Sequence, residues 1–475
     1  MRRAESACIP TTVRGDDFCA RRTWLLGSAA FLLIVAQALP ISAPAGERRV
    51  EREKNVVEAR ILRVKPAVVR IFTEVSAEVT IRCARNDAHV VTPEPDRGSG
   101  TGFIIHPDGW IATNGHVVKP VYDADPEHVA NFLKAAADTA CGPGLALLPK
   151  PERATRMRAI LQDPENQKGV RVAKKLLVDL PHKPGTEKAA TSYPAAVKVY
   201  SPSIDPDRLP KGGGKPDPPM LDAAIIKIEA TNLPTVTLAP SIEYVHLGEE
   251  IFIIGYPGVV LWHTYLDEAS RAEATVTYGR VSSFKNDLNG RRILQTDAAI
   301  SWGNSGGPAV SWSDEVIGVA TFISTSLEGD QAIQGFNFLI PVDTIHALAQ
   351  RIGVTPQSDG PFMREWQAAV NAYFRGAFST ALAHAEAADK ILSDLSDVHQ
   401  LRTHLERLLR DHPMWDTERR VFYGSWLGIA VIVAGIALSG AFGVRAIRKR
   451  RRARRLARAA FSRNSADVPS KRRED

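Results

Sequence analysis

Short runs of apolar residues, each broken by glycine or a turn, dominate the chain from residue 98 onward. The run TGFII, the turn HPDG and the run WIATN follow one another, which is the pattern of a β-hairpin. Similar runs recur later as AAVKVY, AAIIKIE, EIFIIGYP, ATVTYGRVSS, RILQTD, EVIGVATF and FNFLIP. Many short strands separated by turns predict an all-β barrel or sandwich. A helical turn and then a strand are expected just before them, over residues 56–75.

Two stretches interrupt the strand pattern. Residues 121–190 are rich in Ala, Lys and Leu and contain helical spacing, as in VANFLKAAADT and ATRMRAILQ. They predict a mostly helical insert within the β domain. Residues 201–219 are rich in proline and glycine and predict a linker loop.

Two apolar runs are long enough to be a signal-peptide core or a transmembrane helix. Residues 24–39 follow two arginines and end at Pro40, and sixteen residues is the typical length of a signal-peptide core. The sequence APA at 43–45 offers a cleavage site, so residues 1–45 are predicted to be a signal peptide or an N-terminal anchor. The 24 residues 421–444 carry no charge. As a helix they would extend roughly 36 Å, against roughly 30 Å of bilayer hydrocarbon, which predicts a transmembrane helix. A buried core helix is the alternative.

The segment before this span no longer has the pattern of short strands. Residues 360–410 are alanine-rich with helical spacing, and their small and aromatic residues resemble one tetratricopeptide hairpin. A single hairpin of that kind cannot bury its apolar face alone. We therefore expect a helical juxtamembrane segment over residues 355–418. It is either a stalk that holds the domain at 46–350 off the membrane or a docking module for a peptide or partner.

The formal net charge of +7 belongs to the C-terminal tail. Residues 445–475 contain 13 Lys/Arg and 3 Asp/Glu, so the rest of the chain is slightly acidic. A body without excess positive charge predicts no nucleic-acid partner. A basic segment directly after an apolar span is typical of a cytoplasmic tail that contacts anionic lipid headgroups. A nucleic-acid-binding arm is the alternative for the tail alone.

Composition excludes several classes of protein. The chain has 475 residues, of which 44% are hydrophobic and 24% charged, so it is neither wholly disordered nor collagenous. Its four cysteines are too few for a disulfide framework. Only Cys83 and Cys141 lie beyond the leader. They either pair in an oxidising compartment or remain two half-buried thiols.

The most specific chemical motif is GNSGGP at 303–308. A serine hydroxyl is a poor nucleophile unless a neighbouring base removes its proton. It also needs backbone N–H donors aimed at the developing oxyanion, and glycines permit the sharp turn that directs the amides of Gly303 and Ser305 at one point. The motif predicts a nucleophile at Ser305. A glycine-rich turn that merely joins two strands is the alternative.

A base and an orienting carboxylate have candidates elsewhere in the β-rich region. His116, in TNGHVV, follows the strand WIA, where a general base can be held by its backbone. Asp222 directly precedes the apolar strand AAIIKI, so its carboxylate can become buried beside a histidine. Taken alone, a histidine is more often structural, and an aspartate before a strand is more often a turn residue.

The order of these motifs resembles a known family. GSGTGFII, GWIATNGHVV, LDAAIIKIEA, LGEEIFIIGYPG, TYGRVSS, QTDAAISWGNSGGPAV, EVIGVATF and GFNFLIP follow one another as in trypsin-like serine proteases of the Deg/HtrA type. The resemblance covers about residues 56–345 without the inserts. It implies a double β-barrel with the site between the barrels. It also implies that His116 is the base, Asp222 the orienting residue and Ser305 the nucleophile, with Gly303 and Ser305 forming the oxyanion hole.

The chain departs from the family in ways that concern regulation and specificity. Residues 351–420 read as helical, so no PDZ domain is expected. Trp302, just before the oxyanion glycine, is unusual for the family. Ala299 lies six residues before Ser305, where trypsin-like enzymes place the base of the specificity pocket. A small apolar residue there predicts cleavage after small or medium apolar side chains.

These observations predict an all-β, trypsin-like double barrel with a helical insert, followed by a helical stalk and a transmembrane helix. The predicted function is a bacterial membrane-anchored serine endopeptidase that cleaves envelope proteins or peptides, in quality control or stress response. Its domain would be held by the inner membrane and would face the periplasm or the outer face of the membrane, with residues 445–475 in the cytoplasm. Neither metal nor organic cofactor is implied, and small residues spaced by four in the span permit a homo-oligomer. The alternative is a catalytically silent binding or chaperone-like membrane adaptor.

Overall fold

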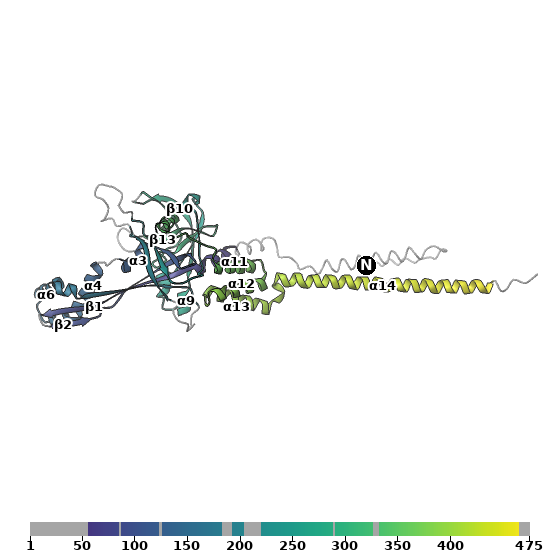
Figure 1. Cartoon of the computed structure of the whole chain (residues 1–475), viewed down its shortest axis with the longest axis horizontal. Coiled ribbons are helices and arrows are strands. Elements are labelled where there is room, and N and C mark those ends of the chain that lie inside the picture. The colour runs from purple at the N-terminus through teal and green to yellow at the C-terminus, as the bar shows by residue number, and fades with distance from the viewer. Residues whose placement is uncertain are drawn as a thin grey trace, which may run out of the picture. The chain divides into compact units, whose positions relative to one another are not determined.

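The computed structural model describes residues 56–84, 87–122, 126–182, 192–203, 220–287, 290–325 and 332–464 (Figure 1). The chain divides into two units, Met1–Val57 and Glu58–Asp475. The predicted signal peptide or anchor at 1–45, most of the linker loop at 201–219 and the end of the basic tail lie outside the described residues.

The first sheet closes into a barrel. Its strands lie in the order β2-β1-β3-β4-β7-β6-β5, and a further pairing of β1 with β5 joins six of them into a ring. The strands are β1 (Val68–Ala84), β2 (Asp87–Val91), β3 (Asp96–His106), β4 (Trp110–Thr113), β5 (Val170–Asp179), β6 (Ser192–Ser201) and β7 (Ala223–Ile228). The 17-residue β1 runs beyond the ring, where β2 pairs with its distal half from Val79 onward.

The second sheet closes in the same way. Its order is β12-β9-β10-β11-β14-β13-β8, and pairing of β12 with β13 joins six strands into a ring, with β8 parallel to β13. The strands are β8 (Thr237–Leu238), β9 (Glu250–Gly255), β10 (Thr275–Asn286), β11 (Arg292–Thr296), β12 (Pro308–Val310), β13 (Glu315–Thr325) and β14 (Ala332–Pro341). Helix α10 (Val342–Arg351) follows the last strand. Two closed six-stranded barrels confirm the predicted trypsin-like double barrel.

The apolar parts of β3, β4 and β7 are buried on both faces, which explains their nearly unbroken apolar runs. Successive side chains of a strand point to opposite faces. Along β3, Phe103 and Ile105 pack with residues of the second barrel such as Ile254 and Val319. Ile104, between them, belongs to a different core that includes Trp366 of the C-terminal helices. One β-strand therefore joins the second barrel on one face and the helices on the other.

The insert is helical over only part of its predicted length. Its helices are α4 (Pro126–Ala140), α5 (Gly142–Leu145), α6 (Lys150–Gln162) and α7 (Pro164–Lys168). The prediction for 121–190 is wrong beyond Lys168, because Val170–Asp179 is strand β5 of the first barrel. The sequence of β5 has no clear period of its own, and its ten-residue pairing with β1 decides its conformation.

The insert builds a small core on the extension of β1 (Figure 1). Phe132, Leu133 and Ala136 of α4 pack with Val79 and Ile81 of β1. Cys83 and Cys141 form a disulfide across this core, with their Cα atoms 5.4 Å apart, so the pairing that the sequence left open is present.

The segment after the barrels is helical, as predicted, but it is not a free spacer. It forms helices α11 (Pro361–Phe374), α12 (Phe378–Ile391) and α13 (Ser396–Asp411). Phe362 and Trp366 of α11 share one core with Ile226 and Ile228 of the first barrel. The Nε1–H of Trp366 donates a hydrogen bond to the carbonyl of Leu62 at 2.7 Å. These helices bury their apolar faces against the barrel, which a lone helical hairpin could not do for itself.

Replacing Trp366 with alanine is expected to destabilise the whole barrel-and-helix body by about 3–5 kcal/mol, because it leaves a cavity in a shared core. The measurement is urea unfolding of the detergent-solubilised chain followed by circular dichroism. Trp262→Ala is the matched control, since Trp262 is 71% exposed, and its effect should stay within about 0.5 kcal/mol. An unchanged barrel transition in Trp366→Ala would show that the helices are a separate unit.

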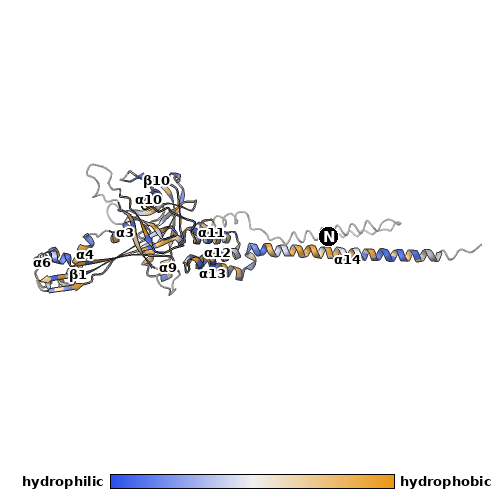
Figure 2. Ribbon diagram, in the orientation of Figure 1, coloured by the Kyte–Doolittle hydropathy of each residue, from blue (hydrophilic) through white to orange (hydrophobic). Residues whose placement is uncertain are grey.

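Helix α14 (Thr417–Asn464) contains the predicted span. Among the described residues it is the one helix long and apolar enough to cross a membrane, with a mean hydropathy of 2.3 over its most apolar window. None of that window is buried, so this helix is not a core helix of the described body. Figure 2 shows its apolar stretch in orange and the basic stretch that follows in blue. Residues 421–444 are thus a candidate membrane span.

Candidate active site

Strand pairing brings His116 and Asp222 together. His116 is the second residue of α3 (Gly115–Tyr122), just after β4, and Asp222 directly precedes β7. These strands are antiparallel neighbours, with Thr113 opposite Ala224, so the end of one meets the start of the other. His116 Nδ1 lies 3.0 Å from Asp222 Oδ1 and 3.1 Å from Oδ2. The backbone N–H of His116 also donates to Oδ1 at 3.0 Å.

The Asp222 carboxylate is held from several sides. Asp222 is only 5% exposed, and its φ of 48° is unusual for a residue with a side chain. Its N–H donates to the carbonyl of Pro202 at 2.8 Å, and Asn114 Nδ2 donates to its carbonyl at 3.1 Å. The Oγ1 hydroxyl of Thr321 donates to Oδ2. These contacts hold the carboxylate with both oxygens facing His116 Nδ1 and with Oδ2 also bonded to Thr321.

Opposing effects act on the pKa of His116. Burial lowers the pKa, whereas the charge of Asp222 and its hydrogen bond raise it. The net result is a pKa above the ordinary histidine value. An imidazole paired with a buried carboxylate through Nδ1 has the arrangement of a general base whose Nε2 faces a substrate.

Ser305 lies in a turn of the second barrel, and its hydroxyl is bonded to the backbone of another strand. Its Oγ donates to the carbonyl of Thr321, in β13, at 3.0 Å. Within the described chain, no hydrogen bond joins Ser305 Oγ to His116. Thr321 thus contacts both the nucleophile candidate and the carboxylate. Proton transfer from Ser305 would require its hydroxyl to turn from that carbonyl towards the imidazole, and such bonds are often loose without substrate.

The turn before Ser305 needs glycine at one position and leaves two backbone amides without a partner among the described residues. Gly303 has a φ of +96°, and a Cβ on it would lie 2.4 Å from the carbonyl oxygen of Tyr256. Only glycine fits this position without strain. Among the hydrogen bonds formed by described residues, none is donated by the amide of Gly303 or of Ser305. Both N–H groups are therefore unused within the described chain.

Thr101 is a site residue that sequence reasoning missed. Its Oγ1 donates to the carbonyl of Gly303 at 2.7 Å and accepts from the N–H of Tyr256 at 3.0 Å. Its own N–H donates to the carbonyl of Ser305 at 2.8 Å. Thr101 is fully buried in β3, so the first barrel fixes the nucleophile turn of the second. The sequence shows only that Thr101 belongs to the motif GSGTGF, and the motif does not predict which groups Thr101 contacts.

The two specificity candidates lie on the surface next to this turn. Ala299 is exposed, and its carbonyl accepts a hydrogen bond from Thr277 Oγ1 at 2.8 Å. Trp302 is 72% exposed, and its carbonyl accepts from the N–H of Gly258 at 2.6 Å. Neither contact tests the predicted pocket at Ala299, which stays a prediction.

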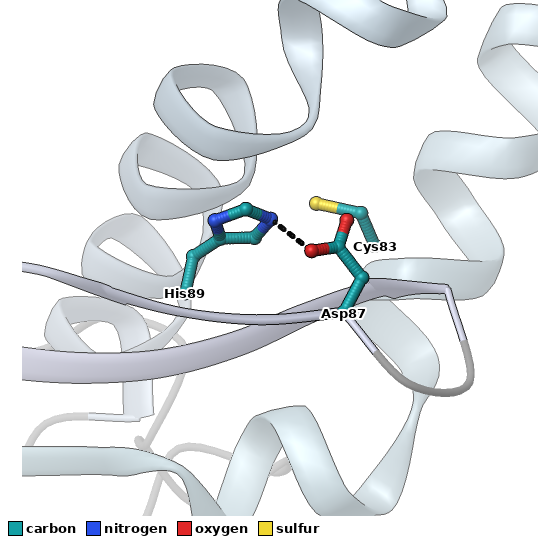
Figure 3. A group of neighbouring side chains, drawn as sticks. All are labelled: Cys83, Asp87 and His89. Carbon is teal, nitrogen blue, oxygen red and sulfur yellow. Dashed lines mark ion pairs between the residues drawn. The ribbon is translucent and has the colours of Figure 1, made fainter.

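A second cluster of side chains that could bind a metal lies at the end of β1 and on β2. The ligand atoms of Cys83, Asp87 and His89 all lie within 4.8 Å of one another, and Asp87 pairs with His89 at 2.9 Å (Figure 3). Cys83 is bonded to Cys141, so its sulfur is not a thiolate. Of the two remaining groups, Asp87 is exposed and His89 is half-buried, and two groups do not make a metal site by themselves.

Comparison with known proteins agrees with this architecture. Residues 100–319 match the family described as the trypsin-like peptidase domain. A putative serine protease HhoB of Synechocystis is 26% identical over 337 residues, covering 69% of this chain and 59% of that protein. A probable periplasmic serine endoprotease DegP-like of Halomonas elongata is 34% identical over 149 residues, or 30% of this chain and 27% of that protein. The chain thus spans well under two thirds of these relatives.

Further relatives carry the same type of name. The serine endoprotease DegS of Haemophilus influenzae is 28% identical over 133 residues, covering 28% of this chain and 36% of that protein. The solved structure of the HtrA-type protease AlgW with a tripeptide is 21% identical, covers 62% of each chain and has a TM-score of 0.34. The chain therefore contains a trypsin-like peptidase domain, over residues 100–319, and is similar to proteins named as DegP-like and DegS serine endoproteases.

Proposed function

We propose that this chain is a membrane-anchored serine endopeptidase with His116, Asp222 and Ser305 as its triad. The observation that carries the proposal is the buried Asp222 carboxylate, 3.0 Å from His116 Nδ1, in a domain that also holds Ser305 beside two unused amides. Ser305 Oγ attacks the peptide carbonyl while His116 takes its proton. The amides of Gly303 and Ser305 stabilise the oxyanion. His116 then protonates the leaving amine, and water releases the acyl group.

Anchoring and orientation follow from α14. We assign residues 421–444 to the bacterial inner membrane and residues 445–475 to the cytoplasm, where their Lys and Arg side chains contact anionic lipids. The peptidase domain then lies in the periplasm, where the Cys83–Cys141 disulfide is stable. The name of the Halomonas relative, a periplasmic endoprotease, supports this side of the membrane. Envelope proteins or peptides are the proposed substrates, with quality control or stress response as the role.

The pH dependence of activity tests His116 as the base. The base acts only as the neutral imidazole, so kcat/KM falls as the pH drops through the pKa of His116. Because Asp222 raises that pKa, the pH at which kcat/KM has fallen to half of its maximum should lie above the ordinary histidine pKa of about 6.5. The measurement is kcat/KM on a soluble peptide from about pH 5 to about pH 9. A midpoint well below pH 6.5 would contradict the assignment.

Substrate preference tests the pocket assigned to Ala299. The wild-type chain should cleave after small or medium apolar side chains. Ala299→Asp should shift this preference towards Lys and Arg, because a carboxylate at the base of the pocket pairs with a cation. The readout is cleavage of a peptide library that varies the residue before the scissile bond. An unchanged preference in a folded, active Ala299→Asp chain would exclude this residue from the pocket base.

One observation favours a second function, a catalytically silent binding module or membrane adaptor. Ser305 Oγ is bonded to the carbonyl of Thr321 rather than to His116. A chain fixed in that arrangement could hold a polypeptide in the crevice without cleaving it.

A fluorophosphonate probe separates the two functions, because it reacts only with a serine activated by its base and oxyanion hole. The wild-type chain in detergent should be labelled and Ser305→Ala should not. Ser313→Ala is the matched control, since Ser313 lies in another turn and bonds to Ser311 and Glu315, and it should be labelled like wild type. Absence of labelling in the wild type, or labelling that persists in Ser305→Ala, would favour the silent module.

A further inference from the structure

A patch of large apolar side chains borders the nucleophile turn. Val259, Trp262 and Trp302 are between 66% and 72% exposed, and Trp302 directly precedes Gly303. A single exposed apolar side chain is ordinary on a protein surface, but neighbouring ones beside a candidate site mark a surface that binds a partner. These three residues are called the aromatic patch below.

The aromatic patch lies against the oxyanion glycine through its backbone. The connection between β9 and β10 contains the short helices α8 (Gly258–Leu261) and α9 (Glu268–Ala272). The N–H of Gly258 donates to the carbonyl of Trp302 at 2.6 Å. A Cβ on Gly258 would lie 3.4 Å from that carbonyl oxygen and 3.9 Å from Cδ1 of Trp262. A Cβ on Gly303 would lie 2.7 Å from the nitrogen of Gly258. The Trp262 ring therefore lies next to the backbone of Trp302, on the loop that packs against Gly303.

The fold holds this surface in place. Leu261 is 7% exposed and belongs to the same core as Ile254 of β9. The N–H of Trp262 donates to the carbonyl of Gly258 at 3.0 Å, which closes the turn of α8. Because Leu261 occupies the inward side of this single turn, Val259 and Trp262 remain on the solvent side.

The two indoles of the aromatic patch make no specific side-chain contact within the described part of the chain. Elsewhere in the same barrel, the exposed ring of Trp312 has the guanidinium of Arg60 at 3.8 Å from its centroid. Among the described residues, neither Trp262 nor Trp302 has a ring, a cation or a hydrogen-bond partner for its side chain. Each indole thus offers a flat apolar face and an N–H donor to a ligand.

A polypeptide bound at the proposed site must pass beside the aromatic patch. Its scissile carbonyl would point at the amides of Gly303 and Ser305, and Gly303 follows Trp302 directly in the chain. One residue of extended chain spans about 3.3–3.6 Å, so side chains one or two residues from that carbonyl can reach the indoles. An aromatic side chain gains most there, because it buries apolar area and stacks on an indole.

We propose that the aromatic patch is a subsite for an aromatic side chain, such as that of phenylalanine, one or two residues from the scissile bond of a bound polypeptide. It is separate from the pocket predicted at Ala299, which takes a small or medium apolar side chain. The subsite depends on the proposed function in one respect, namely that the ligand is a polypeptide held at the Gly303–Ser305 turn. Substrate sequence is then selected at two places rather than one.

Peptide binding to the Ser305→Ala chain tests the subsite without hydrolysis. The full chain is held in lipid nanodiscs, and the probes are blocked decapeptides of glycine and serine with one central valine. Phenylalanine replaces one residue, in turn at each of the two positions before and the two positions after the valine, and the parent peptide is the comparison. In calorimetric titrations, at least one phenylalanine peptide should bind at least about tenfold more tightly than the parent. The position of that phenylalanine identifies the side of the scissile bond.

Further changes in the Ser305→Ala chain locate the selectivity. Trp262→Ala and Trp302→Ala remove exposed side chains and keep the backbone bond of Trp302 to Gly258, so both variants should fold. Each should lower the ratio of the two affinities, and the double change should bring the ratio close to one. Trp312→Ala is the matched control, since it removes an exposed indole elsewhere in the same barrel, and it should keep the ratio.

Several outcomes would overturn the proposal. They are equal binding of the phenylalanine and parent peptides, an unchanged ratio in the double variant, or the same loss of the ratio in Trp312→Ala. An unchanged ratio together with an altered oligomeric state in sedimentation would assign the aromatic patch to a contact between copies of the chain. A catalytically silent chain would still show the ratio. A chain that hydrolyses peptides without showing the ratio would keep the proposed function and lose the subsite.

Discussion

Replacing Ser305 with alanine is expected to lower kcat for peptide hydrolysis by about 10⁶-fold, the largest effect of any single change in this chain. The side chain supplies the attacking oxygen, so no acyl-enzyme can form without it. His116, Asp222 and the oxyanion amides would remain, and they retain a residual acceleration of about 10³–10⁴ over water. The measurement is hydrolysis of a fluorogenic peptide by the purified chain in detergent.

The stability of the variant should change little, which separates loss of chemistry from loss of fold. Ser305 Oγ makes one hydrogen bond, to the carbonyl of Thr321, and the hydroxyl is only half-buried. Removing it should cost about 1 kcal/mol of unfolding free energy. Ser313→Ala, a hydroxyl removed from a neighbouring turn, should retain wild-type rates. A loss below about tenfold in Ser305→Ala would exclude this serine as the nucleophile.

Much of the fold could be predicted from the sequence because local and tertiary preferences agree there. Strands such as AAIIKI are apolar except for one lysine, and both of their faces are buried, one against the second barrel and one against the helices. His116 and Asp222 lie near the ends of such strands, and the pairing of Thr113 with Ala224 accounts for the short distance between them.

The wrong or missing predictions concern segments whose conformation or packing is set by contacts with residues distant in the sequence. Val170–Asp179 has no strand signal of its own and becomes β5 through its pairing with β1. The apolar residues of the C-terminal helices could be read from the sequence, but their packing partner could not. Thr321 is one small polar residue in an apolar run, and Thr101 is one of several polar residues in a glycine-rich motif. Their roles depend on hydrogen bonds between the barrels and across the site, and such bonds produce no periodic pattern in the sequence.

Replacing Asp222 with asparagine is expected to lower kcat by about 10⁴-fold, the second largest effect. The carboxylate stabilises the imidazolium that forms as Ser305 loses its proton, and a neutral amide does not. The amide can also present its NH₂ group to His116 Nδ1, which would stabilise the tautomer that cannot accept the serine proton on Nε2. Asparagine keeps the volume of Asp222, and Thr321 Oγ1 can rotate to accept a hydrogen bond instead of donating one.

The same variant should move the pH profile in a direction that a merely structural role does not predict. In the wild type, burial lowers the pKa of His116 while the charge and hydrogen bond of Asp222 raise it. Asparagine removes the raising effects and leaves burial, so the acidic midpoint of kcat/KM should move to lower pH although the rate falls. Asn114→Ala is the matched control, because Asn114 bonds only to the backbone carbonyl of Asp222 and leaves the charge in place. Its activity should fall less, and its midpoint should stay near that of the wild type. An Asp222→Asn profile with an unchanged or more basic midpoint would mean that this carboxylate does not set the basicity of His116.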